Sequence, residues 1–299
     1  MKTRPFPLTS RVVHAACGLI LAMSLLTTGC SVNKMIGWGA GRMMDGGITA
    51  MYRETDLALA RDAMPTQILL LEGLVEQSPG NTKLRLYAAQ AYYSYAFAFI
   101  EDDDPARAGG FYERALGHAR AALTQVGLRG DLLAMPGDEL SAKLSRLGDD
   151  AVPALFWTAS ALGKWVDVSR NDPAVLAHGF RAVMLMDRVL VLDADYFFSG
   201  PNLFFGAVLA ATPAALGGDP VRSRQYFDKA RAGNQGRLLI VDVLEAQLLL
   251  RQLQDRKAFH DRLTTVVQSP PDLWPEMGLI NQVARVKAAR LLSKEDEWF

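Results

Sequence analysis

Cysteine is scarce in this sequence of 299 residues, which contains only Cys17 and Cys30. Cys17 lies in an N-terminal segment that we expect to be removed, so Cys30 would be the one cysteine of the mature chain. A single cysteine excludes a disulfide framework and a cysteine-based metal site. Beyond that segment, no run of 18 hydrophobic residues occurs, so we expect the mature protein not to span a membrane.

Histidine and unbalanced charge are also lacking. His118, His178 and His260 lie far apart, and none has a second ligand at helical or zinc-finger spacing, so we expect no metal site. The 32 acidic residues equal the 32 basic ones, and no block of lysine or arginine occurs, which argues against nucleic acid as a partner. Proteins and small molecules remain as partners.

Catalytic motifs are absent as well. The sequence has no GxSxG turn for a nucleophile and no glycine-rich phosphate loop after a strand. The nearest stretch, GWGAGRMMDGG at 37–47, follows no strand and ends in no lysine, so a flexible tether explains it better. We therefore expect neither an enzyme nor a bound cofactor.

The N-terminus has the pattern of a targeting signal. Lys2, Arg4 and Arg11 precede a hydrophobic run over about 12–26, which is too short for a membrane span. The run ends in LLTTGCS, which resembles the lipobox of bacterial lipoproteins, although Thr27 stands where leucine is usual. This resemblance implies a signal peptide over 1–29, a lipid on Cys30 and an anchor and tether over 30–45. The alternative is a plain secretory signal with an incidental cysteine.

The rest of the chain has the periodicity of helices. Hydrophobic residues recur at intervals of three and four, whereas short β-branched runs between turn signals do not. In three places an aspartate precedes a proline, at 104–105, 172–173 and 219–220, and each pair predicts a helix start. We predict an all-α protein with helices over 46–60, 64–77, 82–101, 105–124, 152–169, 173–192, 202–215, 220–232, 237–253, 255–268 and 279–293.

These helices are spaced as pairs, which indicates an array of tetratricopeptide-like antiparallel helical hairpins, an α-solenoid. In the clearest register, Ala108, Tyr112 and Ala115 occupy the second helix of a hairpin. Its first helix then carries Tyr92, Tyr95, Ala96 and Phe99. The other repeats are degenerate, so we predict roughly four or five hairpins. They would form a single domain over 46–299, with an insertion near 127–150 that holds one short helix after Pro136.

The run Glu101-Asp102-Asp103-Asp104 could be a cap, an acidic edge that faces a partner, or a metal site. It lacks the alternate ligands and the glycine of a calcium-binding loop. Asp104 is better explained as the N-cap of the helix that starts at Pro105. The other two alternatives stay open.

Aromatic residues supply the candidates for binding. On the helix over 82–101, Tyr92, Tyr95 and Phe99 form one stripe and Tyr93 and Phe97 a second, which leaves a thin polar strip of Gln90, Ser94 and Glu101. Such a helix is buried on two sides, and the second side faces another repeat, a subunit or a cavity. Core packing and a hydrophobic ligand cavity both explain the aromatics, which are Tyr92, Tyr93, Tyr95, Phe97, Phe99, Trp157, Trp165, Phe204 and Phe205.

Several blocks together carry a family resemblance. The lipobox cysteine, AQAYYSYAFAFIEDDDPARA, ALFWTASALGKWVDVSRNDP and FFGAVLAATPAALGGDPVRSRQYFDKA resemble the TatT family, the T component associated with tripartite ATP-independent periplasmic (TRAP) transporters. The resemblance implies a periplasmic lipoprotein of tetratricopeptide-like hairpins that forms a homotrimer and associates with a TRAP substrate-binding protein. It also implies apolar pores or cavities for a hydrophobic small molecule.

Two further expectations concern location and a rival function. Ser31 after the cysteine resembles the sorting signal for the outer membrane, so the lipid would sit in that membrane's inner leaflet.

The rival function is that of a repeat lipoprotein that serves as a scaffold for outer-membrane assembly or envelope maintenance. That rival predicts peptide or membrane-protein partners and no enclosed apolar cavity.

Overall fold

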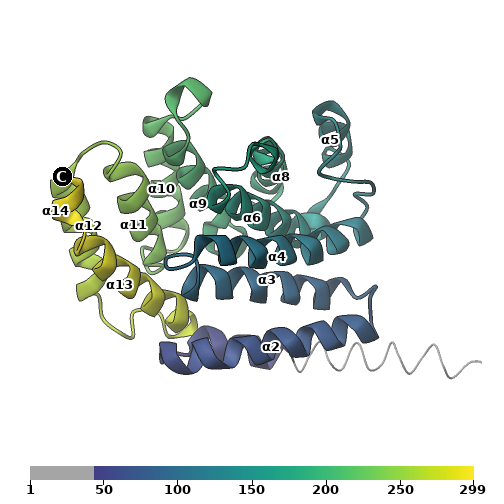
Figure 1. Cartoon of the computed structure of the whole chain (residues 1–299), viewed down its shortest axis with the longest axis horizontal. Coiled ribbons are helices and arrows are strands. Elements are labelled where there is room, and N and C mark those ends of the chain that lie inside the picture. The colour runs from purple at the N-terminus through teal and green to yellow at the C-terminus, as the bar shows by residue number, and fades with distance from the viewer. Residues whose placement is uncertain (1–43) are drawn as a thin grey trace, which may run out of the picture.

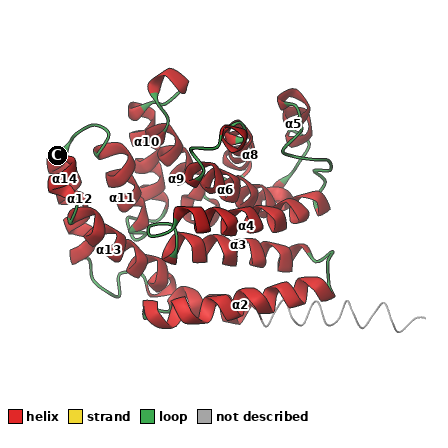
Figure 2. Ribbon diagram, in the orientation of Figure 1, coloured by secondary structure: helices red, strands yellow, loops and turns green. Residues whose placement is uncertain are grey.

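The computed structural model describes residues 44–299, and the predicted signal peptide and Cys30 lie outside them. Figure 2 shows helices and no strands in this part of the chain, which confirms the all-α class. A helical segment covers 44–53. The α-helices that follow are α2 (Leu57–Gln77), α3 (Thr82–Phe99), α4 (Pro105–Gln125), α5 (Gly137–Leu144), α6 (Val152–Val168), α7 (Pro173–Leu176), α8 (Gly179–Leu192), α9 (Tyr196–Ala211), α10 (Pro220–Gly233), α11 (Ile240–Leu244), α12 (Arg256–Gln268), α13 (Gly278–Leu292) and α14 (Glu295–Trp298).

Helices that follow one another along the chain pack side by side. This holds for α2 with α3, α3 with α4, α4 with α6, α6 with α8, and α9 with α10 (Figure 1). At the contact of α3 with α4, the alanines Ala96, Ala108 and Ala115 are fully buried around Tyr112. Small side chains let two helices approach closely, so this contact follows directly from the residue types.

Aspartates start the helices at all three predicted Asp-Pro pairs. The side chain of Asp104 accepts from the backbone N–H of Arg107 at 2.9 Å. Asp172 and Asp219 likewise accept from the N–H groups of the first turns of α7 and α10. The proline after each aspartate has the φ of a first helical residue and lacks an N–H that would go unpaired there. These predicted caps are confirmed.

Removal of one cap has a predictable effect. Asp219→Ala leaves the N–H groups of Val221 and Arg222 without their acceptor, so we expect the free energy of unfolding to fall by about 1 kcal/mol. Asp219→Asn keeps an acceptor oxygen and should retain most of that stability. Urea denaturation of both variants checks this, and equal midpoints for the alanine variant and the unchanged protein would refute the cap.

Several predicted helix limits are wrong. The predicted helix 46–60 ends at residue 53, and residues 54–56 separate it from α2. No helix starts at 64, because α2 begins at a cap on Asp56 and runs through Pro65, where burial of Met64 and Ile68 offsets the missing hydrogen bond. The predicted helix 173–192 is divided into α7 and α8. The predicted helix 202–215 begins close to its expected start, because Phe197, Phe198 and Ser199 at the head of α9 have non-helical φ and ψ, but it ends at Ala211, before Thr212-Pro213.

The predicted helix over 237–253 changes type partway. It begins as α11 and continues as η3, a π-helix over Glu245–Leu250. Other elements are joined by short 3-10 turns, which are η1 (Asp149–Ala151), η2 (Ala214–Leu216) and η4 (Pro275–Met277). In the segment 127–150, α5 follows Pro136 as expected and packs on α8.

The C-terminal part of the chain returns to the N-terminal part. α13 contacts α2, where Leu279 packs with Ala60 and Met64. At the start of α13, a Cβ on Gly278 would lie 2.9 Å from the backbone oxygen of Arg53, so only glycine permits this close approach. Figure 1 shows α13 beside one end of α2 and α3. The chain therefore curls around a central space.

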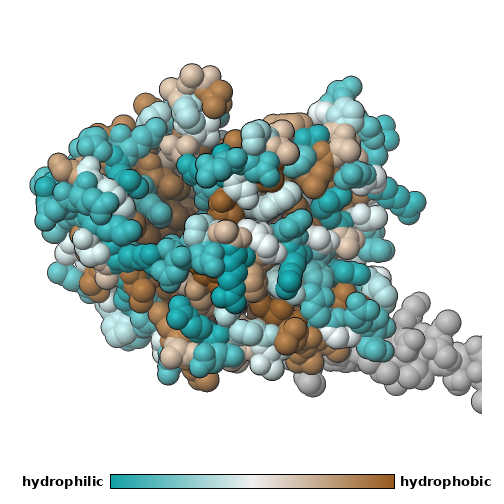
Figure 3. Space-filling model, viewed as in Figure 1, coloured by the Kyte–Doolittle hydropathy of each residue, from teal (hydrophilic) through white to brown (hydrophobic). Residues whose placement is uncertain are grey.

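The face seen in Figure 3 is mostly hydrophilic with scattered hydrophobic patches. One patch lies at the projecting turn between α9 and α10, where Leu216 and Val221 are exposed. Within residues 44–299, no helix combines the length and hydrophobicity needed to cross a bilayer.

Candidate functional site

A cavity of about 330 Å³ lies in the space around which the chain curls. Its wall is built from the helical segment 44–53, α2, α3, α6, α9, α11, η3 and α13. Hydrophobic side chains form most of the wall. The volume falls within the roughly 300–1,000 Å³ that is typical of small-molecule sites.

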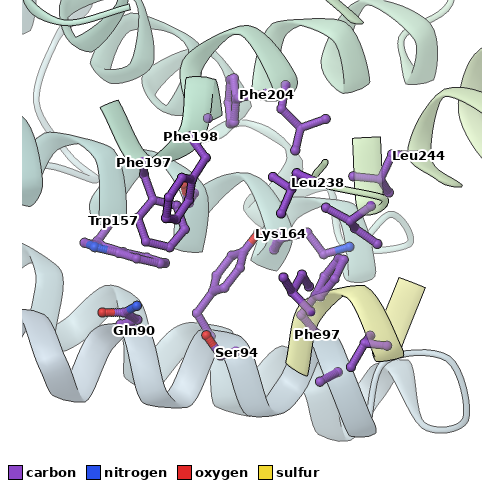
Figure 4. Close-up of a pocket in the computed structure, with 18 of the residues that line it drawn as sticks. Gln90, Ser94, Phe97, Trp157, Lys164, Phe197, Phe198, Phe204, Leu238 and Leu244 are labelled. Atoms are coloured by element: carbon purple, nitrogen blue, oxygen red, sulfur yellow. The ribbon is translucent and has the colours of Figure 1, made fainter. Parts of the chain in front are cut away.

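Aromatic rings form one side of the cavity (Figure 4). The centroid of Trp157 lies 5.6 Å from that of Tyr93 and 4.9 Å from that of Phe197, both edge-to-face. Phe97 continues the stripe of Tyr93 along α3, with ring centroids 6.3 Å apart. Burial raises the pKa of the Tyr93 phenol to about 12, so the ring stays neutral at physiological pH. This side offers an uncharged surface to an apolar molecule.

Phe197 and Phe198 reach the cavity from an unusual backbone turn. Phe197, Phe198 and Ser199 have φ values of 47°, 62° and 67°, in the left-handed region. That conformation costs about 1–2 kcal/mol per residue. Asn202 stabilises the turn by donating to Ser199 Oγ at 2.9 Å and to the backbone oxygen of Ala194 at 3.1 Å. Strained turns of this kind occur where surrounding packing fixes them, commonly at binding sites.

The structure separates the predicted aromatic candidates into two groups. Tyr93, Phe97, Trp157 and Phe204 line the cavity. The other five, which lie in contacts between helices, are Tyr92, Tyr95, Phe99, Trp165 and Phe205.

Each of these five has a packing role. Tyr92 donates its hydroxyl to Glu72 at 2.7 Å, and Tyr95 and Phe99 pack at the contact of α3 with α2. Trp165 stacks on His178, and Phe205 stacks on Tyr226. Core packing is therefore the better interpretation for this group.

Charged side chains meet at another part of the cavity wall. Glu101, whose side chain is 10% exposed, lies 2.8 Å from Lys164 Nζ and 3.1 Å from Lys287 Nζ. It also accepts a hydrogen bond from the hydroxyl of buried Tyr112. Burial alone would raise the pKa of Glu101, but the two lysines outweigh burial and hold this pKa below its usual value. Lys164 also pairs with Asp167 at 3.0 Å.

The next two acids of the run bind α13. Asp102 lies 2.9 Å from Lys287 Nζ, and Asp103 lies 2.6 Å from Arg290 Nη1. These ion pairs and that of Glu101 with Lys287 join the turn between α3 and α4 to a helix more than 180 positions further along the chain. Among the described residues, no group of acidic, histidine and cysteine side chains could hold a metal ion. These acids therefore hold α13 against the turn between α3 and α4.

Sequence reasoning missed several polar residues of the cavity. Gln90 and Ser94, which form a polar strip with Glu101 on α3, face the cavity, as do Gln67, Ser160 and Gln247. No hydrogen bond joins the side chains of these five residues to other described parts of the chain. The strip was visible in the sequence, but a thin polar strip on a hydrophobic helix ordinarily indicates contact with solvent.

Fold and site together define an all-α protein that is built around an apolar cavity with a charged cluster in its wall. Residues 53–299 match the family described as TAtT, TRAP transporter T-component, and the chain belongs to this family. The family resemblance drawn from the sequence is thereby confirmed. Members of this family are accessory proteins of TRAP transport in the cell envelope and are not known as enzymes. A comparison with curated proteins gives no match.

Proposed function

We propose that this protein is a periplasmic lipoprotein of a TRAP transport system that holds a hydrophobic solute in its cavity and binds the cognate substrate-binding protein. The observation that carries the proposal is the apolar cavity of about 330 Å³. The pocket is partly open to solvent and most of its wall is hydrophobic. A hydrophobic pocket of this size with a few polar groups is typical of small-molecule sites, so it is a feature to be explained.

The cavity also favours this function over the rival one. A scaffold for outer-membrane assembly or envelope maintenance needs an exposed surface for peptides and no enclosed apolar space. Here the aromatic candidates on the second stripe of α3, Tyr93 and Phe97, line a hydrophobic pocket that is only partly open to solvent. Solute binding therefore explains an observation that scaffolding leaves unexplained.

The remaining parts of the proposal come from the family resemblance and from the lipobox-like stretch around Cys30. The hairpins would form a tetratricopeptide-like array in a single domain, three copies would form a homotrimer, and a lipid on Cys30 would anchor the protein in the inner leaflet of the outer membrane. Exposed hydrophobic side chains such as Leu216 are available for contacts with the substrate-binding protein or another copy. Solute transfer between the two proteins would then need no energy source in this chain.

Co-purification tests the partner. We expect the tagged full chain, expressed in its native host, to retain a TRAP substrate-binding protein through affinity purification. The same tag on an unrelated lipoprotein serves as the control. Recovery of outer-membrane assembly factors in place of the binding protein would favour the scaffold function.

A further inference from the structure

We infer that the cavity takes an uncharged amphiphile, a molecule with an apolar body and neutral hydrogen-bonding groups such as hydroxyls or amides. This inference rests on the proposed function, because it specifies the class of solute that the cavity holds. Two independent observations support it: the charges in the wall are already paired, and the neutral polar side chains are not.

Every charged residue of the cavity wall has a partner of opposite charge. Lys164 pairs with Glu101 and Asp167, Glu101 also pairs with Lys287, and Asp167 also pairs with Arg170. A ligand carboxylate would have to displace Glu101 or Asp167 from Lys164. A ligand ammonium would have to displace Lys164 from the acids. Either ion would otherwise lie unpaired against a mostly hydrophobic wall, which is unfavourable.

The neutral polar side chains of the wall, in contrast, have no hydrogen-bond partner among the described residues. Gln90 and Ser94 lie four residues apart on α3 and thus on one face, and Gln67, Ser160 and Gln247 face the same cavity. Each glutamine offers two N–H donors and one carbonyl acceptor, and each serine a hydroxyl that donates and accepts. Because no other described residue uses these groups, they are available to a ligand.

The positions of these polar side chains suit a ligand that has one polar end and one apolar end. Figure 4 shows Gln90 and Ser94 on α3, with the rings of Trp157, Phe197 and Phe198 across the cavity from them. Phe204, Leu238 and Leu244 extend the apolar side of the wall. Neutral hydrogen-bonding groups of the ligand would therefore contact the polar strip of α3, while its apolar body contacts the rings.

A matched series of ligands tests the inference. The full chain carrying Cys30→Ser, purified without detergent, is titrated with decanol, decanoate and decylamine at neutral pH by isothermal titration calorimetry. These probes share a chain length and differ in the charge of one end. We expect decanol to bind at least about tenfold more tightly than either ion.

One substitution should reverse part of this preference. Asp167→Asn removes one of the two acids that pair with Lys164, so we expect the affinity for decanoate relative to decanol to rise about tenfold. Asp103→Asn is the matched control, because Asp103 pairs with Arg290 and does not line the cavity. It should leave the ratio unchanged.

The possible outcomes separate the inference from the proposed function. Tighter binding of decanoate or decylamine than of decanol to the unchanged cavity would overturn the inference and leave the solute-binding function standing. Binding of none of the three probes would overturn both.

Discussion

Glu101→Gln is expected to lower the free energy of unfolding by about 3 kcal/mol at neutral pH. The substitution removes the one carboxylate that lies within 3.1 Å of both Lys164 Nζ and Lys287 Nζ, and Lys287 is only 8% exposed. Lys287 keeps Asp102 and Lys164 keeps Asp167, but the two cations lose the carboxylate that both of them share, and glutamine replaces it with a neutral group of the same shape that has one acceptor oxygen. Urea denaturation measures the loss.

Asp103→Asn is the control for this experiment too. The carboxylate of Asp103 is exposed and pairs with Arg290 at the protein surface, so its removal should change stability little. If the two variants unfold at the same urea concentration, the cluster around Glu101 does not hold α13 to the turn between α3 and α4.

The contribution of Glu101 to the free energy of unfolding should also depend on pH. The pKa of Glu101 is lowered in the folded protein, so the unfolded chain takes up the proton first as pH falls. The stabilisation is therefore fully present above the unfolded pKa of about 4.3 and is lost as pH falls through the lower folded pKa. Accordingly, the difference in stability between the unchanged protein and Glu101→Gln should shrink below that window.

Ser94→Trp is expected to weaken decanol binding by at least about tenfold, because the indole would occupy the space between α3 and the aromatic side of the cavity. The protein should still fold. Overpacking of a filled core costs about 1–3 kcal/mol, but Ser94 faces an open volume. Calorimetric titration with decanol measures the affinity, and thermal denaturation checks the fold.

Leu70→Trp is the matched control for the cavity. Leu70 is 50% exposed on α2 and does not line the cavity, so a tryptophan there adds the same ring without filling the space. Decanol affinity should stay at the level of the unchanged protein. Equal affinity in both tryptophan variants would show that decanol binds elsewhere.

Local features of this fold could be predicted from the sequence because local chemistry fixes them. The caps at Asp104, Asp172 and Asp219 follow from an acceptor next to a proline. Burial of Ala108, Tyr112 and Ala115 follows from small and aromatic residues at helical spacing. The predicted start of a helix at 64 is wrong because tertiary packing of α2 outweighs the helix-breaking tendency of Pro65.

The cavity could be predicted only in part. The sequence indicated that α3 is buried on two sides, and Tyr93 and Phe97 do line the cavity on the second side. Its closure depends on α13, which meets the acidic run through contacts between distant parts of the chain. The left-handed turn could not be predicted, because none of its three residues with positive φ, Phe197, Phe198 and Ser199, is a glycine. Asn202 stabilises it through a hydrogen bond to Ser199.

The most direct test of solute binding is a crystal structure of the protein with a decanol that carries bromine on its terminal carbon, because the anomalous signal locates the bromine. We predict a bromine position among Phe197, Phe204 and Leu238, with the hydroxyl of the ligand beside Gln90 and Ser94. A bromine position on the outer surface, with the cavity free of ligand density, would contradict the assignment of this cavity as a solute site.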